Sequence, residues 1–144
     1  MQYKKNGFTL VEILIVMGLA LIIAGLSVPV GVRFYQTQVL VDTTNSIIST
    51  LRRANSNSVF QKNDNAHGVK FLSDSYVLFE GVSYTDRTVS EDEVFTLPSS
   101  ISISGASEIV FSELYGTTTS ATLIVATDID NQSININAQG KIEK

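Results

Sequence analysis

The chain has 144 residues, with 10 Lys and Arg against 14 Asp and Glu, a net charge of −4 and no cysteine. A nucleic-acid-binding protein usually has a basic balance, so this charge argues against DNA or RNA as a general partner. The lack of cysteine excludes disulfides, thiolate metal sites and a lipid anchor on a cysteine. Beyond an apolar N-terminal region, the length suffices for one small domain.

The chain opens with a short basic segment and a long apolar run. Lys4 and Lys5 precede the run, which extends from Phe8 to Val32 and contains one charged residue, Glu12. About 25 residues form roughly 37 Å of helix, enough to cross a hydrocarbon core of about 30 Å. The two lysines favour a cytoplasmic N-terminus, with the remainder of the chain outside the cytoplasm.

Three interpretations of this run compete. A secretory signal peptide has a shorter apolar region, of about 7–15 residues, before a small-residue cleavage site. The segment Ala24-Gly25-Leu26-Ser27 is a poor site of that kind. A plain membrane anchor leaves Glu12 unexplained, because a carboxylate within the span costs on the order of 2.5–3.5 kcal/mol. A leader that is removed before Phe8 places Glu12 one helical turn from the new N-terminus.

The stretch Gly7-Phe8-Thr9-Leu10-Val11-Glu12 resembles the processing site of type IV prepilins and pseudopilins. The resemblance implies that a prepilin peptidase cleaves after Gly7 and N-methylates Phe8, and that Glu12 acts in filament assembly. Pairing the new amine of Phe8 with Glu12 of a neighbouring subunit would offset part of the cost of burying each charge.

The same resemblance implies partners and a location. The partners would be other pilins or pseudopilins, the prepilin peptidase and an inner-membrane assembly platform. The precursor would be a single-pass protein of the inner membrane with its head outside the cytoplasm, and would then enter a pilus or pseudopilus. No cofactor is implied.

The helix is predicted to continue beyond the apolar run, over about Phe8 to Phe60. Pro29, followed by Gly31, predicts a kink near the membrane exit. Apolar and small residues then recur at intervals of three and four and form one stripe: Val39, Leu40, Thr43, Ile47, Ile48, Leu51, Ala54 and Ser58. We expect this stripe to pack on the chain's own sheet, since a coiled coil would need more heptads.

From Ala66 onward the hydrophobic period changes to two, which is typical of strands. The expected strands are 69–72, 76–79, 94–97, 101–103, 108–111, 122–126, 133–137 and 140–142, with a hairpin at Ser73-Asp74-Ser75 and a polar loop over 81–92. Because no helix intervenes between them, the strands should pair antiparallel.

The predicted fold class is therefore α+β: a long N-terminal membrane-spanning helix packed on an antiparallel head of one sheet or two small ones. The predicted parts are a leader at 1–7, a transmembrane and filament-core half of the helix at 8–32, an amphipathic half at 33–61, and a head at 62–144.

The order of elements also resembles the GspH/FimT-like minor pseudopilins and minor pilins. The resemblance rests on Leu51-Arg52-Arg53-Ala54, His67-Gly68-Val69, Leu97-Pro98 before Ile101-Ser102-Ile103, Ile109-Val110-Phe111 and Ile134-Asn135-Ile136. It implies a structural subunit of a type II secretion pseudopilus or a type IV pilus. The alternative function is a tip module that binds DNA or another surface.

Catalytic signatures are lacking in the sequence. His67 is the single histidine, and neither an HExxH nor a GxSxG pattern occurs, so we expect a structural histidine at a strand edge and no enzyme activity. Arg52 and Arg53 are expected to pair with acidic residues of the head or of a neighbouring subunit, a contact worth about 0–1 kcal/mol.

Two polar segments are candidate ligand sites. The segment 128–131, Asp-Ile-Asp-Asn, offers oxygens to Ca²⁺ but lacks the glycine and the later glutamate of an EF-hand, and hairpin turns favour Asp and Asn in any case. We therefore expect no metal site. Lys141 and Lys144 resemble a weak version of the basic tail through which some FimT-like pilins contact DNA, with Glu143 between them. Glu91-Asp92-Glu93 is expected to be a solvated loop edge.

Overall fold

The computed structural model describes residues 7–144, apart from the side chains of residues 26–30. The chain divides into two compact units, residues 1–35 and residues 36–144. Lys4 and Lys5 of the predicted leader lie outside the described residues. The division predicted from the sequence at residues 7, 32 and 61 stays a prediction.

A single helix, α1, runs from Leu10 to Val59 over 50 residues. The predicted long helix is therefore confirmed, with ends one or two residues inside those expected. In the first unit, every described side chain from Gly7 to Tyr35 is exposed. Among the residues that the structure describes, no helix combines the length and hydropathy needed to cross a membrane. The helix continues through Pro29, but the side chain of Pro29 lies outside the described residues, so the kink stays a prediction.

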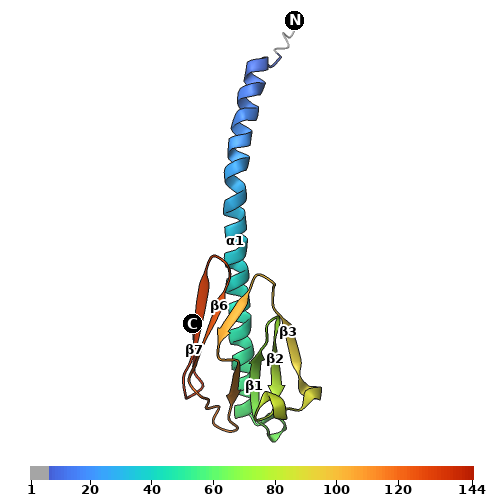
Figure 1. Ribbon diagram of the computed structural model, residues 1–144, viewed down its shortest axis with the longest axis vertical. Coiled ribbons are helices and arrows are strands. Elements are labelled where there is room, and N and C mark those ends of the chain that lie inside the picture. Colours follow the sequence, from blue (N-terminus) through green and yellow to red (C-terminus); the bar gives the residue numbers. More distant parts are fainter. Residues whose placement is uncertain (1–6) are drawn as a thin grey trace, which may run out of the picture. The chain divides into compact units, whose positions relative to one another are not determined.

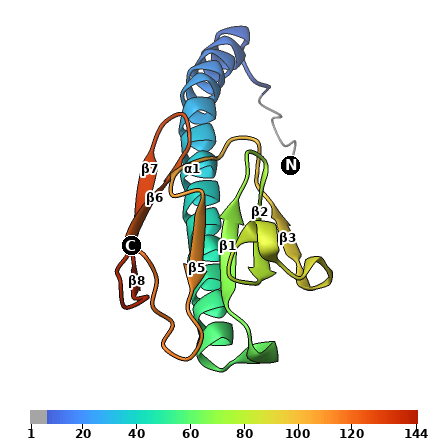
Figure 2. The same ribbon diagram turned by 60° about the horizontal axis from the view of Figure 1, so that its bottom comes forward.

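The second unit contains two four-stranded antiparallel sheets, shown in Figures 1 and 2. The first sheet has the order β3-β2-β1-β5, from Glu93–Thr96, Ser75–Glu80, His67–Phe71 and Glu108–Phe111. The second has the order β4-β6-β7-β8, from Ser102–Gly105, Ala121–Ala126, Asn131–Ile136 and Ile142–Glu143. The predicted α+β class is confirmed, with two small sheets.

The helix α1 packs on both sheets through the predicted stripe. One hydrophobic core joins the helix to both sheets. Its fully buried helix residues are Leu40, Ile47, Leu51 and Ala54. The sheet residues of this core are Val69, Phe71, Tyr76, Leu78, Ile109, Phe111, Leu123, Val125, Ile134, Ile136 and Ile142. Burial of these apolar surfaces is the main force that holds α1 to the head. The prediction of packing on the chain's own sheet is confirmed.

Two predicted strands begin later than expected, for local backbone reasons. Ile101 lies outside β4 because its N–H donates to the carbonyl of Pro98, 2.9 Å away, in a turn. The last strand begins after Gly140, which has a φ of 75° and donates its N–H to the carbonyl of Asn137 in another turn. Neither turn residue can therefore join the adjacent strand ladder.

The loop after β2 covers the outer face of the first sheet. The loop contains two short 3₁₀ turns, Tyr84–Asp86 and Val89–Glu91. The ring of Tyr84 meets Phe79 edge to face, with ring centroids 5.6 Å apart. Strand β2 is consequently buried along its whole length, on both faces. The sequence predicted the loop but not this covering role.

The loop over residues 112–117 is tied to α1. The Asn55 side-chain amide donates to the carbonyl of Gly116 at 2.8 Å. Gly140 passes so close to that carbonyl that an added Cβ would lie 2.1 Å from the oxygen. A side chain is excluded there, so glycine allows the C-terminal loop to cross this junction.

Candidate functional site

The predicted processing motif lies at the start of α1, where Thr9 and Glu12 form a reciprocal cap. The Glu12 N–H donates to Thr9 Oγ1 at 3.2 Å, and the Thr9 N–H donates to Glu12 Oε2 at 3.4 Å. A threonine followed three residues later by a glutamate is the pattern of a capping box, which satisfies two helix N–H groups that would otherwise lack a partner. The cap explains why the helix begins at Leu10.

The cap leaves the Gly7–Phe8 peptide bond outside the helix. Residues 7–9 have no helical or strand structure, and Phe8 is 80% exposed. Phe8 and Ile13 line the same shallow hollow, together with Leu10, Leu14 and Met17. A hydrophobic residue just before the cap and one at the fourth helical position are the pair that forms a hydrophobic staple.

Gly7, Phe8 and Glu12 thus lie together at one helix end, as the motif predicts. Sequence reasoning missed the part played by Thr9, although the Thr-x-x-Glu spacing was available as a signal. The carboxylate of Glu12 is exposed and its bond to Thr9 is long, so it remains able to accept a further cationic donor. Its place in the first turn also suits the partial positive charge of the helix N-terminus.

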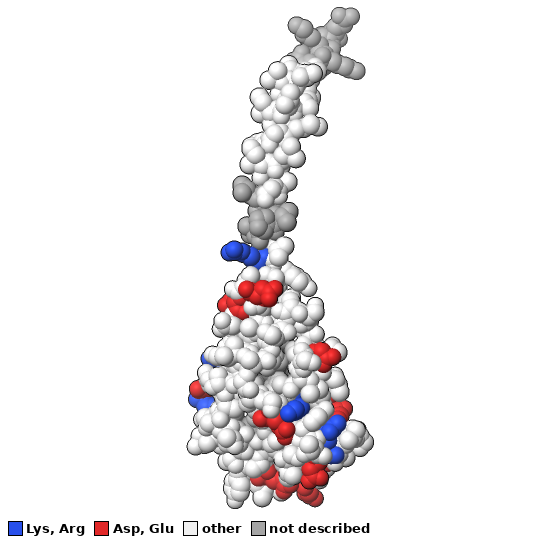
Figure 3. All heavy atoms as spheres, viewed as in Figure 1, with Lys and Arg blue, Asp and Glu red and all other residues white. Residues whose placement is uncertain are grey.

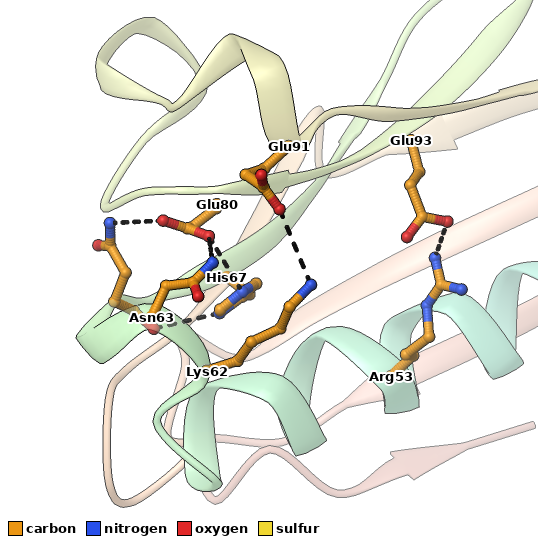
Figure 4. A network of polar contacts seen from close by, with 8 residues as sticks. Arg53, Lys62, Asn63, His67, Glu80, Glu91 and Glu93 are labelled. Atoms are coloured by element: carbon orange, nitrogen blue, oxygen red, sulfur yellow. Dashed lines mark hydrogen bonds and ion pairs between the residues drawn. The ribbon is translucent and has the colours of Figure 1, made fainter.

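A second polar cluster lies where α1 passes into β1, and Figure 4 shows it from close by. Glu80, at the end of β2, is only 5% exposed. It accepts a hydrogen bond from the side chain of Asn63 at 2.6 Å and one from the side chain of Asn65 at 3.2 Å. A buried carboxylate requires such partners, and here both come from the loop after α1.

His67 completes this cluster and is 3% exposed. Its Nδ1 lies 3.1 Å from the carbonyl of Asn65, which can only accept, so Nδ1 carries the proton in this contact. Its Nε2 lies 3.9 Å from Glu80 and has no hydrogen-bond partner among the described residues. Burial lowers the pKa of His67 from its ordinary value, against a smaller opposing effect of Asn65 and Glu80.

The sequence placed His67 at the edge of a strand, and the structure has it there, in a strand that is central in its sheet. His67 is the first residue of β1, which lies between β2 and β5 and is a central strand. Its N–H donates to the buried hydroxyl of Ser58 at 2.8 Å, which fixes the strand start against the last turn of α1. These contacts to Ser58 and Asn65 give His67 a structural role.

The acidic run 91–93 was expected to be solvated, and the side chains of Glu91 and Glu93 are 41% and 51% exposed, although each of the three carboxylates also has a cationic partner. Glu93 pairs with Arg53 of α1, which confirms a pairing predicted for that arginine. Glu91 lies 3.9 Å from Lys62, and Asp92 lies 2.8 Å from Arg87. Hydrogen bonding to Asp92 raises the pKa of Arg87, whose guanidinium also lies 3.8 Å from the ring centre of Tyr84.

The remaining candidate residues are not brought together. Lys141 pairs with Glu143 at 2.5 Å, and this hydrogen bond raises the pKa of Lys141; Lys144 is exposed at the C-terminus. Within residues 128–131, the Asp130 side chain accepts from the N–H of Asn131, as in an ordinary turn. Across the part of the chain that the structure describes, no three His, Cys, Asp or Glu residues are placed to hold a metal ion.

Comparison with known proteins gives a motif match near the N-terminus and a fold match that covers most of the chain. Residues 2–28 match the prokaryotic N-terminal methylation motif. The fold is similar to that of the minor pseudopilin EpsH from the type 2 secretion system of Vibrio cholerae, with a TM-score of 0.59 and 11% sequence identity. The similarity covers 72% of this chain and 94% of that one. No curated protein matches the sequence.

The chain thus combines the N-terminal methylation motif with a head whose fold is similar to that of a minor pseudopilin. The predicted resemblance to prepilins and pseudopilins is confirmed at this level. At 11% identity, the structural similarity speaks for the fold alone.

Proposed function

We propose that this chain is a precursor that a prepilin peptidase cleaves after Gly7 and methylates at Phe8, and that then assembles as a minor subunit of a type II secretion pseudopilus or type IV pilus. The observation that carries the proposal is the co-occurrence of the methylation motif over residues 2–28 with a pseudopilin-like head in one chain. Either feature alone would be weaker support, since the motif is short and the fold carries no chemistry.

The arrangement at the start of α1 supports the cleavage step. A peptidase acts on an exposed peptide bond, and the cap at Thr9 keeps the Gly7–Phe8 bond outside the hydrogen-bonded helix. Cleavage converts Phe8 into the N-terminus and creates an amine close to the first turn. Two charges in an apolar setting are each costly alone, and pairing offsets part of that cost.

Glu12 supplies the anion for this pairing. In the precursor its carboxylate accepts a 3.4 Å hydrogen bond from Thr9, and a carboxylate has acceptor capacity left for an ammonium group. An amine of one subunit that meets Glu12 of another would fix the axial register of the two helices. The apolar side chains between Leu10 and Ile23, all exposed in the isolated chain, would form the contacts around the pair.

We propose the inner membrane as the location of the precursor, and the assembly platform and peptidase of that membrane as its partners. The sequence basis is the run from Phe8 to Val32 with one charged residue, flanked by Lys4 and Lys5. The GspH/FimT-like subfamily is supported by the order of elements and by the similarity of fold to EpsH.

The test is the intact mass of the full chain, extracted from membranes of cells that contain its peptidase. We expect a polypeptide that begins at Phe8 and carries one additional methyl group. A chain that begins at Met1, or one cut after Ala24, contradicts the proposal.

A second measurement tests the pairing. Glu12→Ala should be inserted and cleaved like the wild type, yet its recovery in filaments should fall about tenfold or more, which corresponds to about 1.4 kcal/mol. Asp42→Ala is the matched control, because Asp42 is also an exposed carboxylate of α1 with one side-chain donor, Gln38, at 3.1 Å. Equal recovery of the two variants would show that the Glu12 pair is unnecessary.

A further inference from the structure

Exposed apolar side chains gather where α1 ends. Phe60, Leu114 and Tyr115 are 80%, 55% and 79% exposed. The N–H of Leu114 donates to the carbonyl of Ser58 at 3.2 Å, so the loop over 112–117 lies directly against the helix end. An added Cβ on Gly116 would lie 2.7 Å from a methyl group of Val59, which confirms this close approach. We call Phe60, Leu114 and Tyr115 the helix-end patch.

The loop holds the patch in solvent at a conformational cost. The N–H of Tyr115 donates to the carbonyl of Glu113 at 2.7 Å, which makes Leu114 the centre of a γ-turn with a φ of 67°. A γ-turn at positive φ is rare and strained, most of all for a branched side chain. Three hydrogen bonds between Ser112 and Thr117 close the loop at its base: one between backbones at 2.8 Å, one between hydroxyls at 2.7 Å, and one from the Thr117 N–H to the Ser112 hydroxyl at 3.1 Å.

This geometry is more consistent with a docking surface than with an incidental loop. Stability of the folded chain alone would favour buried side chains at Leu114 and Tyr115, and glycine in place of Leu114 at the centre of the turn. The chain has neither feature. A loop that is already ordered loses little conformational entropy when it binds, so its exposed aromatic and aliphatic groups can contribute fully to an interface.

The surroundings of the patch are acidic. Glu113 directly precedes Leu114, and Asp64 follows Phe60 by four residues; within the described chain neither carboxylate has an ion pair. Lys62 is engaged by Glu91 at 3.9 Å. Figure 3 shows acidic side chains gathered at the lower end of the head, where Figure 1 places the end of α1. The patch therefore suits a partner with an aromatic centre and a cation.

The first unit carries a segment with this chemistry, Arg33-Phe34-Tyr35. Phe34 and Tyr35 are 72% and 68% exposed. Arg33 is also exposed and has no ion pair among the residues that the structure describes. Arginine and aromatic residues are the types most enriched at interface hot spots.

We propose that the helix-end patch of one subunit docks on the Arg33-Phe34-Tyr35 segment of a second copy of this chain. The aromatic rings meet Phe60, Leu114 and Tyr115, and Arg33 meets Glu113 and Asp64. Because the two surfaces differ, each contact leaves one surface of each kind free, so further copies can follow one another along a filament where the rotation between them does not close into a ring. The inference rests on the proposed filament role and requires at least two copies in one assembly.

Cross-linking of engineered cysteines tests the contact, with no background from the wild-type chain, which has no cysteine. Full-length chains with Tyr115→Cys and with Tyr35→Cys carry different tags and are expressed together with the peptidase and the assembly platform. A short bismaleimide should join them at a yield at least tenfold above that of Ser133→Cys with Tyr35→Cys, since Ser133 is exposed on β7, away from the patch.

Charge reversal supplies the specific readout. Arg33→Glu in the Tyr35→Cys chain should reduce the yield about tenfold, and Glu113→Arg in the Tyr115→Cys chain should restore it. Leu114→Gly, placed in the same chain, removes the docking side chain but suits the positive φ, so it should lower the yield while the head stays folded.

Two results would overturn the proposed contact, and only one of them would also overturn the proposed function. A yield equal to that of the Ser133 control, or cross-links only between two Tyr115→Cys chains, in cells where the chain begins at Phe8 and enters filaments, rejects this contact and leaves the proposed function intact. An unprocessed N-terminus at Met1 rejects the proposed function and this inference with it.

Discussion

Glu80→Ala is the substitution that most directly tests why the head is ordered where α1 meets β1. Three residues of this loop that are not glycine, Gln61, Asn63 and Asp64, have φ values of 52°, 58° and 51°. Each costs on the order of 1 kcal/mol relative to ordinary backbone. The carboxylate of Glu80 binds the side chains of Asn63 and Asn65 and so holds the loop in this conformation.

The expected loss follows from these two hydrogen bonds. A hydrogen bond to a charged group contributes about 1.5–3 kcal/mol, so the pair contributes roughly 3–6 kcal/mol before compensation. Two effects reduce this loss. Removing the carboxylate also removes the desolvation cost of burying its charge, since Glu80 is only 5% exposed. Asn63 is exposed, so water can replace its lost hydrogen bond. We expect a net loss of about 2–3 kcal/mol, or about 10 °C in the melting temperature of a head of this size.

The assay is thermal and urea unfolding of the full chain in detergent, followed by near-ultraviolet circular dichroism of tyrosine. The chain has no tryptophan, and Tyr76 and Tyr84 both pack against other rings within the head. The matched control is Glu91→Ala, which removes the same charge from an exposed pair with Lys62 of this loop and should cost at most about 0.5 kcal/mol. If Glu80→Ala costs no more than Glu91→Ala, the anchoring role of Glu80 is wrong.

Two further predictions concern His67 and Thr9. Burial lowers the pKa of His67, so the unfolded chain takes up a proton more readily than the folded one. The contribution of His67 to stability should be complete above pH 6.5 and should be lost as the pH falls below that value toward the lowered pKa of the folded chain. His67→Gln should flatten this dependence, because the chain has one histidine, and an unchanged slope would assign it to other groups. Thr9→Val removes the hydroxyl that accepts the Glu12 N–H, so amide exchange in the first turn of α1 should accelerate about fivefold, while Thr9→Ser should exchange like the wild type; equal rates in all three would show that the cap does not hold the helix start.

Much of the fold is predictable from the sequence because one pattern dominates each half. The helical stripe from Val39 to Ser58 and the alternating strands after Ala66 each reflect burial on one face, and burial decides secondary structure most directly. Gly7, Phe8 and Glu12 could be singled out from the sequence because they belong to one short contiguous motif, and their roles stay predictions. The start of β4 and β8 was not, since turns at Pro98 and at Gly140 take up the residues that the alternation assigns to strands.

The polar contacts between distant segments could not be predicted. Arg53, Lys62 and Arg87 come from three different elements and reach one acidic run, 91–93, and only the folded chain shows which cation meets which carboxylate. Glu80 carries no local signal either, because in sequence it simply follows the expected strand 76–79 and precedes a polar loop. Its burial depends on the loop that crosses above it.

The first turn of α1 shows how one residue can serve two stages of the proposed function. Before cleavage, the Glu12 carboxylate caps its own helix through Thr9, which fixes the helix start two residues beyond the Gly7–Phe8 bond. After cleavage, the same carboxylate would meet an amine of a neighbouring chain at a similar depth. The two roles are compatible because the cap depends mainly on the Thr9 hydroxyl at 3.2 Å, whereas the carboxylate bond is the longer of the two, at 3.4 Å. Assembly can therefore recruit Glu12 without unwinding the helix that brings it there.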